Sequence, residues 1–263
     1  MNLSGLYAVT GGASGIGRGV ARAFAAAGAD VAVFDANGDA AESAAAELGA
    51  VARQLDVSDA EQVDAVFAGL GPLAGLVACA GISDVTPIVE LAADTWRHVL
   101  GVQLDGTFFC LRAAARNMLE HEVAGTIVTT ASVNATFGHR GLSAYSAAKA
   151  GIAMLTKVAA LEFAQAGIRV NAIAPGIVET GMTAAVLQDP GFVRTWTDAT
   201  PLGRVGRPGD IADVVLFLSS PASRWMTGQT LAVDGGTSLR VEPKMFPDEA
   251  WSAESLRKRL VSG

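Results

Sequence analysis

The stretch Thr10-Gly11-Gly12-Ala13-Ser14-Gly15-Ile16-Gly17 decides the fold, because it joins an apolar, strand-like segment at 6–10 to an alanine-rich, helix-like segment at 17–27. Glycine lets the backbone turn tightly and lets a diphosphate approach without a Cβ in the way. A helix N-terminus offers free N–H groups and a partial positive charge to such an anion. The stretch therefore predicts a nucleotide-binding turn, although an ordinary tight turn between strand and helix has the same composition.

The same alternation of strand and helix continues along the chain. Short apolar runs that do not alternate with polar residues are typical of strands buried on both faces. Such runs lie at 6–10, 31–35, 76–80, 126–130, 169–174 and 230–233. Helical stretches lie between them at 17–27, 40–48, 60–70, 95–119 and 145–165. This order predicts an α/β fold, a doubly wound, Rossmann-like parallel sheet with helices on both faces.

Capping residues mark the ends of several predicted helices. Ser58 and Asp94 stand where N-caps are expected, because their side-chain oxygens can accept hydrogen bonds from the first free N–H groups. Gly28, Gly49 and Gly167 stand where helices are expected to stop, since glycine readily takes up the left-handed conformation at a helix end.

The pattern predicts one Rossmann-like domain over residues 1–236 and a C-terminal extension over residues 237–263. Within the domain, residues 176–207 form an unusually long connection that contains Gly, Pro and large apolar side chains, as binding loops and lids do. In the extension, residues 252–261 fit a helix with Ser252 as its N-cap.

The composition limits the expected partners and compartment. The 263-residue chain is 51% hydrophobic, and its formal net charge of −7 is spread along the sequence. An acidic surface repels phosphate backbones and anionic lipids, and no apolar run is long enough to span a bilayer. We therefore expect neither nucleic acid nor membrane as a partner.

Cys79 and Cys110 do not make a disulfide framework or a metal site. The start of the chain leaves no room for a signal peptide, so a cytoplasmic location is expected.

Asp35 closes the second predicted strand, about 20 residues beyond the glycine-rich turn. A carboxylate at such a strand end can accept hydrogen bonds from the adenosine ribose hydroxyls, and it repels the extra phosphate of NADP. No Arg or Lys precedes Gly15 in the turn or directly follows Asp35. The sequence therefore predicts NAD as the cofactor. The alternative is that Asp35 is a solvated carboxylate in the turn at 35–38.

Tyr145 and Lys149 stand at i and i+4 near the start of a predicted helix, so their side chains share one face. A free phenol has a pKa of about 10, too high for an efficient base near neutrality, and a neighbouring ammonium lowers that pKa. The two residues are therefore a candidate general acid/base pair. Ser132, at the end of a predicted strand, can orient a substrate oxygen beside them. The same Tyr-x-x-x-Lys spacing also occurs by chance on helix surfaces.

Together these motifs resemble the short-chain dehydrogenase/reductase family over residues 5–236. The features that carry the resemblance follow one another in the family's order and are Thr10–Gly17, Asp56-Val57, Ala80-Gly81, Ser132, Tyr145-Ser146-Ala147-Ala148-Lys149, Asn171, Pro175-Gly176 and Asp234-Gly235-Gly236. The resemblance implies an NAD-dependent oxidoreductase that interconverts a secondary alcohol and a ketone by hydride transfer, without a metal. It also implies a homotetramer or homodimer formed through the helices at 95–119 and 145–165.

The resemblance assigns a role to each matching residue. In catalysis, Ser132 would hold the reacting oxygen, Tyr145 would exchange its proton, and Lys149 would bind the nicotinamide ribose and lower the tyrosine pKa. The implied cofactor-binding residues are Gly11, Ser14, Gly15, Ile16, Gly17, Asp35, Asp56, Val57, Cys79, Ala80, Gly81, Tyr145, Lys149, Pro175, Gly176, Val178 and Thr180. Asn171 and Asp234 are interpreted as structural, with Asp234 shaping a turn.

Candidate substrate contacts lie around these motifs. They are Ser132, Asn134, His139, Tyr145, Met182, Phe192 and Trp196. The alternative for His139 is a surface residue, and the alternative for the three large apolar side chains is ordinary packing. Their apolar character favours a small, mostly apolar alcohol or ketone, cyclic or aryl-bearing, as the substrate.

Two departures from the family's pattern leave alternatives open. Ala78-Cys79-Ala80-Gly81 stands where the family commonly has Asn-Asn-Ala-Gly. Gln103 stands where the family usually has a catalytic Asn, so it is either a member of the proton relay or a helix-packing amide. The alternative functions are an NADPH-dependent carbonyl or oxoacyl-thioester reductase, against which Asp35 argues, and an NAD-binding protein with little catalytic activity.

Overall fold

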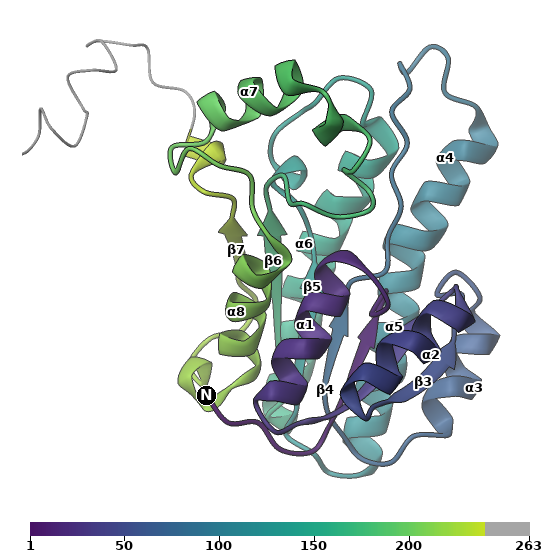
Figure 1. The fold of residues 1–263 in the computed structure, drawn as a ribbon. Coiled ribbons are helices and arrows are strands. Elements are labelled where there is room, and N and C mark those ends of the chain that lie inside the picture. Colours follow the sequence, from purple (N-terminus) through teal and green to yellow (C-terminus); the bar gives the residue numbers. More distant parts are fainter. Residues whose placement is uncertain (240–263) are drawn as a thin grey trace, which may run out of the picture.

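The computed structural model describes residues 1–239, in which seven strands form one parallel sheet (Figure 1). The strand order is β3-β2-β1-β4-β5-β6-β7, and each neighbouring pair is parallel. The strands are β1 (Leu6–Thr10), β2 (Asp30–Asp35), β3 (Val51–Gln54), β4 (Leu73–Ala78), β5 (Thr126–Thr130), β6 (Arg169–Pro175) and β7 (Thr230–Val233). The chain runs outward from β1 to β3 and then returns to β1's other side, which confirms the doubly wound fold.

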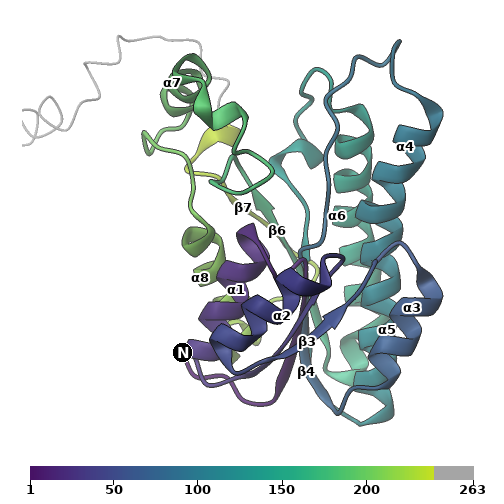
Figure 2. The ribbon, with the colours of Figure 1, turned by 45° about the vertical axis from the view of Figure 1, so that its right-hand side comes forward.

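Helices cover both faces of the sheet, with α1, α2 and α8 on one side and α3, α5 and α6 on the other (Figure 2). The helices are α1 (Gly15–Ala26), α2 (Gly38–Leu48), α3 (Ala60–Ala68), α4 (Ala93–Leu100), α5 (Gly106–Glu120), α6 (Ser143–Phe163), α7 (Pro190–Ala199) and α8 (Pro208–Ser219). A π-helical segment, η1 (Gly101–Asp105), joins α4 to α5, and a 3-10 turn, η2 (Val133–Ala135), follows β5.

The core consists of two apolar layers, one on each face of the sheet. Successive strand residues point to opposite faces, so Val33 packs with Phe24 of α1 in one layer and Phe34 packs with Met118 of α5 in the other. All four of these side chains are buried. Burying a side chain of this size contributes about 1.5–3 kcal/mol. The two-sided burial explains why the strands are short apolar runs without alternation.

Several elements differ from their sequence-based predictions. β4 begins and ends earlier than predicted, so Cys79 and Ala80 lie in the turn that follows it. Val51–Gln54 was not recognised as a strand, because it is a mostly exposed edge strand without an apolar run. α7 and α8 were also not predicted, since each starts with a proline inside a stretch that reads as a loop.

Two of the predicted N-caps are wrong. The N-cap of α3 is Asp59, whose Oδ1 accepts from the N–H groups of Glu61 and Gln62 at 3.0 Å, whereas Ser58 lies outside the helix. The N-cap of α4 is Ala92, and Asp94 lies in the first turn, where it pairs with Arg97 at 2.9 Å. In both cases the capping position is shifted by only one or two residues.

The three predicted glycine stops are correct. Gly28, with φ of 90°, directly follows Ala27, the C-cap of α1. Gly49 follows α2 with φ of 63°, and Gly167 ends the turn after α6 with φ of 75°. The predicted helix at 252–261 lies outside the described residues. Among residues 1–239, no helix has the length and apolar character needed to cross a bilayer.

Candidate active site

The candidate site lies where the carboxyl ends of the central strands meet, at the end of the sheet below α7 (Figure 1). In open parallel sheets, ligands bind outside this end, at the point where neighbouring strands connect in opposite directions. Here that point lies between β1 and β4, which are neighbours in the sheet but not in the chain. The glycine-rich turn follows β1 directly, so it faces this position.

The glycine-rich turn is held so closely that side chains would not fit. Gly11 has φ of 63°, and a Cβ there would lie 2.8 Å from the backbone of Ala80. A Cβ on Gly17 would overlap the carbonyl oxygen of Gly11. Ser14 is the N-cap of α1 but makes no side-chain cap bond, and the first turn of α1 holds no acidic residue. Within residues 1–239, the start of α1 therefore has N–H groups available for an anion, which fits the diphosphate of a dinucleotide.

Substitution of Gly17 by Ala is expected to lower Tm by at least about 5 °C and to weaken cofactor binding more than tenfold, because the new Cβ must displace the turn backbone. Gly209→Ala is the matched control, since Gly209 also lies in the first turn of a helix but has open space around its Cβ position. Thermal unfolding and calorimetric titration with NAD measure both effects. Equal behaviour of the two variants would contradict this account of the turn.

Asp35 ends β2 beside the turn, and both of its oxygens are held by backbone. Oδ2 accepts from Ala13 N at 3.3 Å, and Oδ1 accepts from Asn37 N at 3.1 Å. The carboxylate is therefore fixed between the glycine-rich turn and the turn that starts α2. This placement is the one expected for a residue that binds a ribose next to the turn.

Ser132, Tyr145 and Lys149 come together from two elements. Ser132 follows β5, where its Oγ accepts from Asn134 N at 3.1 Å. Tyr145 lies in the first turn of α6 and is a hydrogen-bond partner of the Ser132 hydroxyl. The Lys149 ammonium lies 5.4 Å from the centre of the Tyr145 ring. The structure thus brings the three predicted catalytic side chains into one cluster.

Lys149 is buried, and its Nζ donates to the carbonyl of Thr130 at 2.6 Å. Thr130 is the last residue of β5 and was not singled out from the sequence, because a backbone carbonyl leaves no signal in residue type. The Thr130 hydroxyl in turn lies 3.3 Å from Sγ of Cys79. Cys79, which stands where the family has Asn, therefore still links the ends of β4 and β5, through a weak sulfur contact.

Burial dominates the electrostatics of the cluster. It raises the pKa of the Tyr145 phenol, and the hydrogen bond with Ser132 only partly opposes this. Burial also lowers the pKa of Lys149 to about 8, because a charged group is disfavoured away from water. That Lys149 lowers the tyrosine pKa during the reaction stays a prediction.

Gln103 lies in the π-helical segment η1 and is buried. Its Nε2 donates to the carbonyl of Ile82 at 2.5 Å, directly after Gly81. Its backbone carbonyl accepts from the Thr107 hydroxyl at 2.6 Å. Through these contacts Gln103 ties the loop after β4 to η1, and its part in a proton relay stays a prediction. Its Oε1 is shielded from solvent and has no hydrogen-bond partner within the described part of the chain.

The remaining predicted cofactor positions surround the same end of the sheet. Ala80 N donates to Oγ1 of Thr10 at 3.3 Å, which ties the end of β4 to the end of β1. The side chain of Thr180 lies against Gly15, where a Cβ would be 3.2 Å away. The connection at 176–207 therefore reaches the glycine-rich turn. The other positions in this set are Ile16 in α1, Asp56 and Val57 after β3, and Pro175, Gly176 and Val178 at and after the end of β6.

The carboxylate of Asp56, like that of Asp35, is already engaged within the protein. Oδ1 accepts from the N–H of Ser58 at 2.9 Å and from the Ser58 hydroxyl at 2.7 Å, and these bonds lower the pKa of Asp56. Asp234 is engaged likewise, by the N–H groups of Gly236 and Ser238 at 3.0 and 2.7 Å. The contacts of Asp234 are those of a residue that shapes a turn, as interpreted from the sequence.

A cavity of about 370 Å³ lies between the loop after β5 and α7. The His139 ring stacks on Trp196 with centroids 5.5 Å apart, and Phe192 lies beside Trp196 at 5.9 Å. Met182 is half exposed and lies away from the cavity walls, so the structure does not group it with the other two apolar side chains. The walls are Val133, Phe137, Gly138, His139, Thr195, Trp196, Ala199, Thr237 and Ser238.

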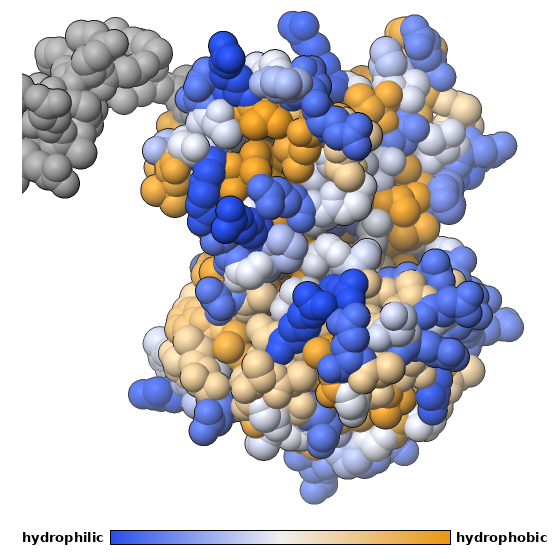
Figure 3. Space-filling model, viewed as in Figure 1, coloured by the Kyte–Doolittle hydropathy of each residue, from blue (hydrophilic) through white to orange (hydrophobic). Residues whose placement is uncertain are grey.

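The polar wall residues Thr195, Thr237 and Ser238 were missed by the sequence analysis, because serine and threonine in a loop or near a terminus carry no distinctive spacing. Asn134 is not a wall residue, although it lies next to Val133, which is one. Figure 3 shows apolar surface on the part of the molecule that carries α7, beside hydrophilic residues.

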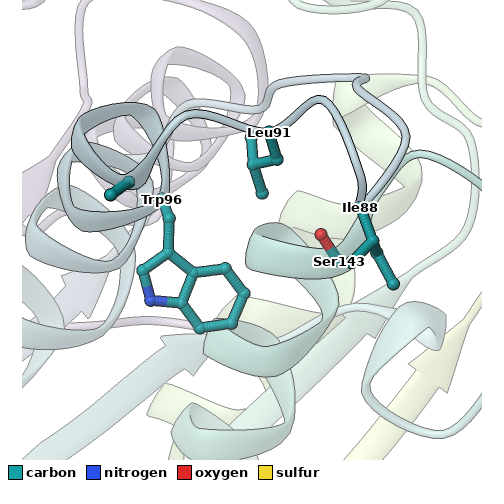
Figure 4. A pocket seen from close by; sticks show the side chains of 5 residues that line it. Ile88, Leu91, Trp96 and Ser143 are labelled. Atoms are coloured by element: carbon teal, nitrogen blue, oxygen red, sulfur yellow. The ribbon is translucent and has the colours of Figure 1, made fainter.

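A second, apolar cavity of about 490 Å³ lies between the loop after β4, α4 and the start of α6. Leu91, Trp96 and Ser143 surround it, with Ile88 at its edge (Figure 4). It contains no acid, base or nucleophile other than the Ser143 hydroxyl among the described residues. Over residues 1–239 there is also no group of three or more His, Cys, Asp or Glu side chains arranged to hold a metal ion.

Comparison with known proteins decides the family. The sequence model described as enoyl-(acyl carrier protein) reductase matches residues 11–238, which is most of the chain. The chain belongs to the short-chain dehydrogenase/reductase family. Members of this family are oxidoreductases with a nicotinamide dinucleotide cofactor, and in this chain the glycine-rich turn and the cluster around Tyr145 lie at the same end of the sheet.

Relatives within the family differ in substrate and cofactor. Galactitol 2-dehydrogenase (L-tagatose-forming) of Cereibacter sphaeroides is 44% identical, over 88% of this chain and 94% of its own. Human (3R)-3-hydroxyacyl-CoA dehydrogenase is 38% identical, over 89% of this chain and 95% of its own. A gluconate 5-dehydrogenase from Burkholderia cenocepacia, solved with NADP and tartrate, is 33% identical with a TM-score of 0.87, over 92% of this chain and 97% of its own. The chain is thus an oxidoreductase of alcohols or ketones in a family whose members differ in cofactor.

Proposed function

We propose that this protein is an NAD-dependent dehydrogenase that interconverts a secondary alcohol and a ketone, with Tyr145 as the general acid/base. The observation that carries the proposal is the cluster of Ser132, Tyr145 and Lys149 at the same end of the sheet as the glycine-rich turn. A protein that only binds a dinucleotide has no need of an acid/base cluster next to it. This argues against the alternative of an NAD-binding protein with little activity.

Proton transfer is the part of the reaction that these side chains perform. Bound nicotinamide supplies the hydride acceptor for alcohol oxidation and the donor for ketone reduction. Tyr145 takes the hydroxyl proton as the carbonyl forms, or returns it to the carbonyl oxygen in the reverse direction. Ser132 holds that oxygen beside the phenol. Lys149, with its pKa near 8, is suited to pass the proton between the tyrosine and solvent near neutral pH.

NAD rather than NADP is supported by the surroundings of Asp35. Its fixed carboxylate would lie next to the extra phosphate of NADP and repel it. The nearby cations on α1 do not compensate, because Arg18 and Arg22 both pair with Glu47, at 2.5 and 2.8 Å. The same charge argues against the NADPH-dependent carbonyl or oxoacyl-thioester reductase alternative.

Asp35→Ser is expected to lower kcat/KM for NAD at least tenfold and to move the NAD/NADP ratio toward NADP, because two ribose hydrogen bonds and the repulsion are lost together. Initial rates with each cofactor and a panel of secondary alcohols, followed by NADH or NADPH absorbance, test both the function and the preference. Asp39→Ser is the control, since Asp39 is exposed in the adjacent first turn of α2. Faster turnover with NADP in the unmodified protein overturns the NAD assignment.

We further propose that the protein is a homodimer or homotetramer that packs through α5 and α6, in the cytoplasm. Large apolar side chains on these helices are exposed, and they are Phe108, Leu119, Met154, Val158 and Leu161. Light scattering coupled to size exclusion measures the mass directly. Val158→Glu is expected to shift the measured mass toward that of the monomer, because a carboxylate buried in an apolar interface is costly.

The unpaired thiols of Cys79 and Cys110 are consistent with a reducing compartment.

A further inference from the structure

The cavity between the loop after β5 and α7 has one wall that can recognise hydroxyl groups. His139 is held by stacking on Trp196, so the edge of its ring cannot turn freely. Within residues 1–239 neither ring nitrogen of His139 has a hydrogen-bond partner, and of the two only Nδ1 is shielded from solvent. The other nitrogen, Nε2, is therefore open to a ligand in the cavity that His139 lines, and a ligand hydroxyl can form a hydrogen bond with it.

The threonine hydroxyls of the same wall are acceptors. Thr195 Oγ1 donates its proton to the carbonyl of Gly191 at 2.9 Å. Thr237 Oγ1 is within 2.7 Å of the carbonyl of Asp234 and 2.9 Å of Oγ1 of Thr200. Each hydroxyl has a single proton, and in both residues the protein already uses it. What these oxygens offer to a ligand is therefore a lone pair, which requires an O–H or N–H donor on the ligand.

The described walls of the cavity carry no charged side chain. None of these residues is Lys, Arg, Asp or Glu, so they offer no counter-ion to a carboxylate or phosphate, and they fit a neutral ligand. Val133, Phe137 and Ala199 supply apolar surface for a carbon skeleton. The volume of about 370 Å³ is that of a small-molecule site. The cavity also adjoins the reacting position, because Val133 directly follows Ser132.

We propose that the substrate is a neutral polyol, oxidised at one secondary carbon to a hydroxyketone, and that His139, Thr195 and Thr237 bind its other hydroxyl groups. This inference rests on the proposed dehydrogenase function and makes its substrate class specific. It replaces the mostly apolar, cyclic or aryl substrate expected from the sequence. That expectation counted the large apolar side chains of the 176–207 connection but had no means of placing the polar ones beside them.

The two electrons that leave the alcohol in this oxidation are taken up by the proposed cofactor. The carbinol C–H bond breaks and its hydride passes to NAD, while the O–H proton passes to the Tyr145 phenolate, whose own proton has left by way of Lys149, and the C=O bond forms. The remaining hydroxyl groups of the polyol are not changed. A site built to bind a hydroxyl group discriminates strongly against an analogue without it, because its own polar groups are then left unmatched.

Kinetics with matched alcohols test the proposal. The stereoisomeric hexitols are compared with 2-hexanol, and erythritol with 2-butanol, each with NAD. At least one polyol is expected to exceed its monohydroxy counterpart about tenfold or more in kcat/KM. His139→Phe keeps a ring against Trp196 and removes Nε2, so it is expected to lower kcat/KM for that polyol about tenfold, mainly through KM. The same variant is expected to leave kcat/KM for the monohydroxy alcohol within about twofold.

A pair of neighbouring threonines supplies the control. Thr195→Val is expected to weaken polyol turnover about fivefold or more. Thr197→Val is expected to leave it unchanged, because Thr197 lies on the same helix, is not a wall residue of the cavity and bonds only to the carbonyl of Arg194. Preference for 2-hexanol over every hexitol, or an equal loss of both alcohol types in His139→Phe, overturns the proposal while leaving the dehydrogenase function in place.

Binding separates the two proposals when turnover is absent. Calorimetric titration of the hexitols and 2-hexanol into the Tyr145→Phe protein with NAD bound requires no reaction. If the hexitols bind and His139→Phe abolishes this binding, the polyol site is supported. This holds even if the unmodified protein oxidises no alcohol, and in that case only the dehydrogenase function is wrong. Absence of hexitol binding and of hexitol oxidation overturns the polyol site.

Discussion

Tyr145→Phe is expected to lower kcat about 10²- to 10⁴-fold, because the substrate loses the group that exchanges its hydroxyl proton. The phenyl ring still fits beside Lys149, so the fold is expected to be unchanged. Cofactor affinity is expected to stay within a few-fold of the original value, since the glycine-rich turn and Asp35 are untouched. Stopped-flow or steady-state NADH absorbance measures the first effect, and calorimetric titration with NAD the second.

The chain offers a matched control for this substitution, because Tyr7 is its other tyrosine. Tyr7 lies in β1 and meets Phe24 edge to face, with 4.8 Å between the ring centroids, in the apolar layer beneath α1. Tyr7→Phe is expected to keep full turnover. If Tyr145→Phe also kept full turnover, the acid/base assignment would be wrong. If the unmodified protein had no turnover to lose on any alcohol or ketone, the alternative of a dinucleotide-binding protein would be favoured.

Lys149→Met is expected to lower kcat/KM at least about 10²-fold and, at the same time, to stabilise the cofactor-free protein. Burial lowers the pKa of Lys149 to about 8 in the folded protein, whereas an unfolded lysine has a pKa of about 10.4. The charged side chain therefore costs about 3 kcal/mol of folding free energy below pH 8. Methionine removes this cost, although the carbonyl of Thr130 loses its hydrogen bond, which offsets about 1 kcal/mol or more.

The pH dependence of stability distinguishes this account from a packing effect. Between pH 8 and about 10.4 the unfolded chain binds more protons at this lysine than the folded one, so the original protein gains stability as pH rises. The advantage of Lys149→Met is expected to be a few degrees in Tm at pH 6–7 and to vanish near pH 10. Lys157→Met, at an exposed position of the same helix, is expected to show no such dependence. A Tm below that of the original protein across this whole range would contradict the burial argument.

The sequence predicted the elements that a strong local pattern specifies. Such patterns are the glycine-rich turn, the buried strands and the Tyr-x-x-x-Lys spacing. They were enough to predict the fold and the residues that cluster at the carboxyl ends of the strands. The edge strand Val51–Gln54 could not be recognised, because only one of its long sides is paired and its side chains are mostly exposed. α8 could not be recognised either, since what identifies it is its packing against α1 across the sheet face.

The chemistry of the site was harder to predict than its location. The pKa of Tyr145 depends on how deeply α6 buries it, and a spacing of four residues carries no information on depth. Similarly, His139 and Trp196 are far apart in the chain, and their stacking results from the path of the 176–207 connection. Gln103 was assigned two possible roles, and its bond to the Ile82 carbonyl shows which contact its amide makes in the folded chain.

The contact between Thr180 and Gly15 has a kinetic consequence. The 176–207 connection contains α7, which walls the cavity, and it also lies against the turn where the diphosphate is expected. The alcohol and the dinucleotide therefore bind against the same segment. We expect the dinucleotide to associate first and leave last, with the alcohol and its product exchanging while it stays in place. Release of the reduced dinucleotide then becomes the natural candidate for the slowest step of the cycle.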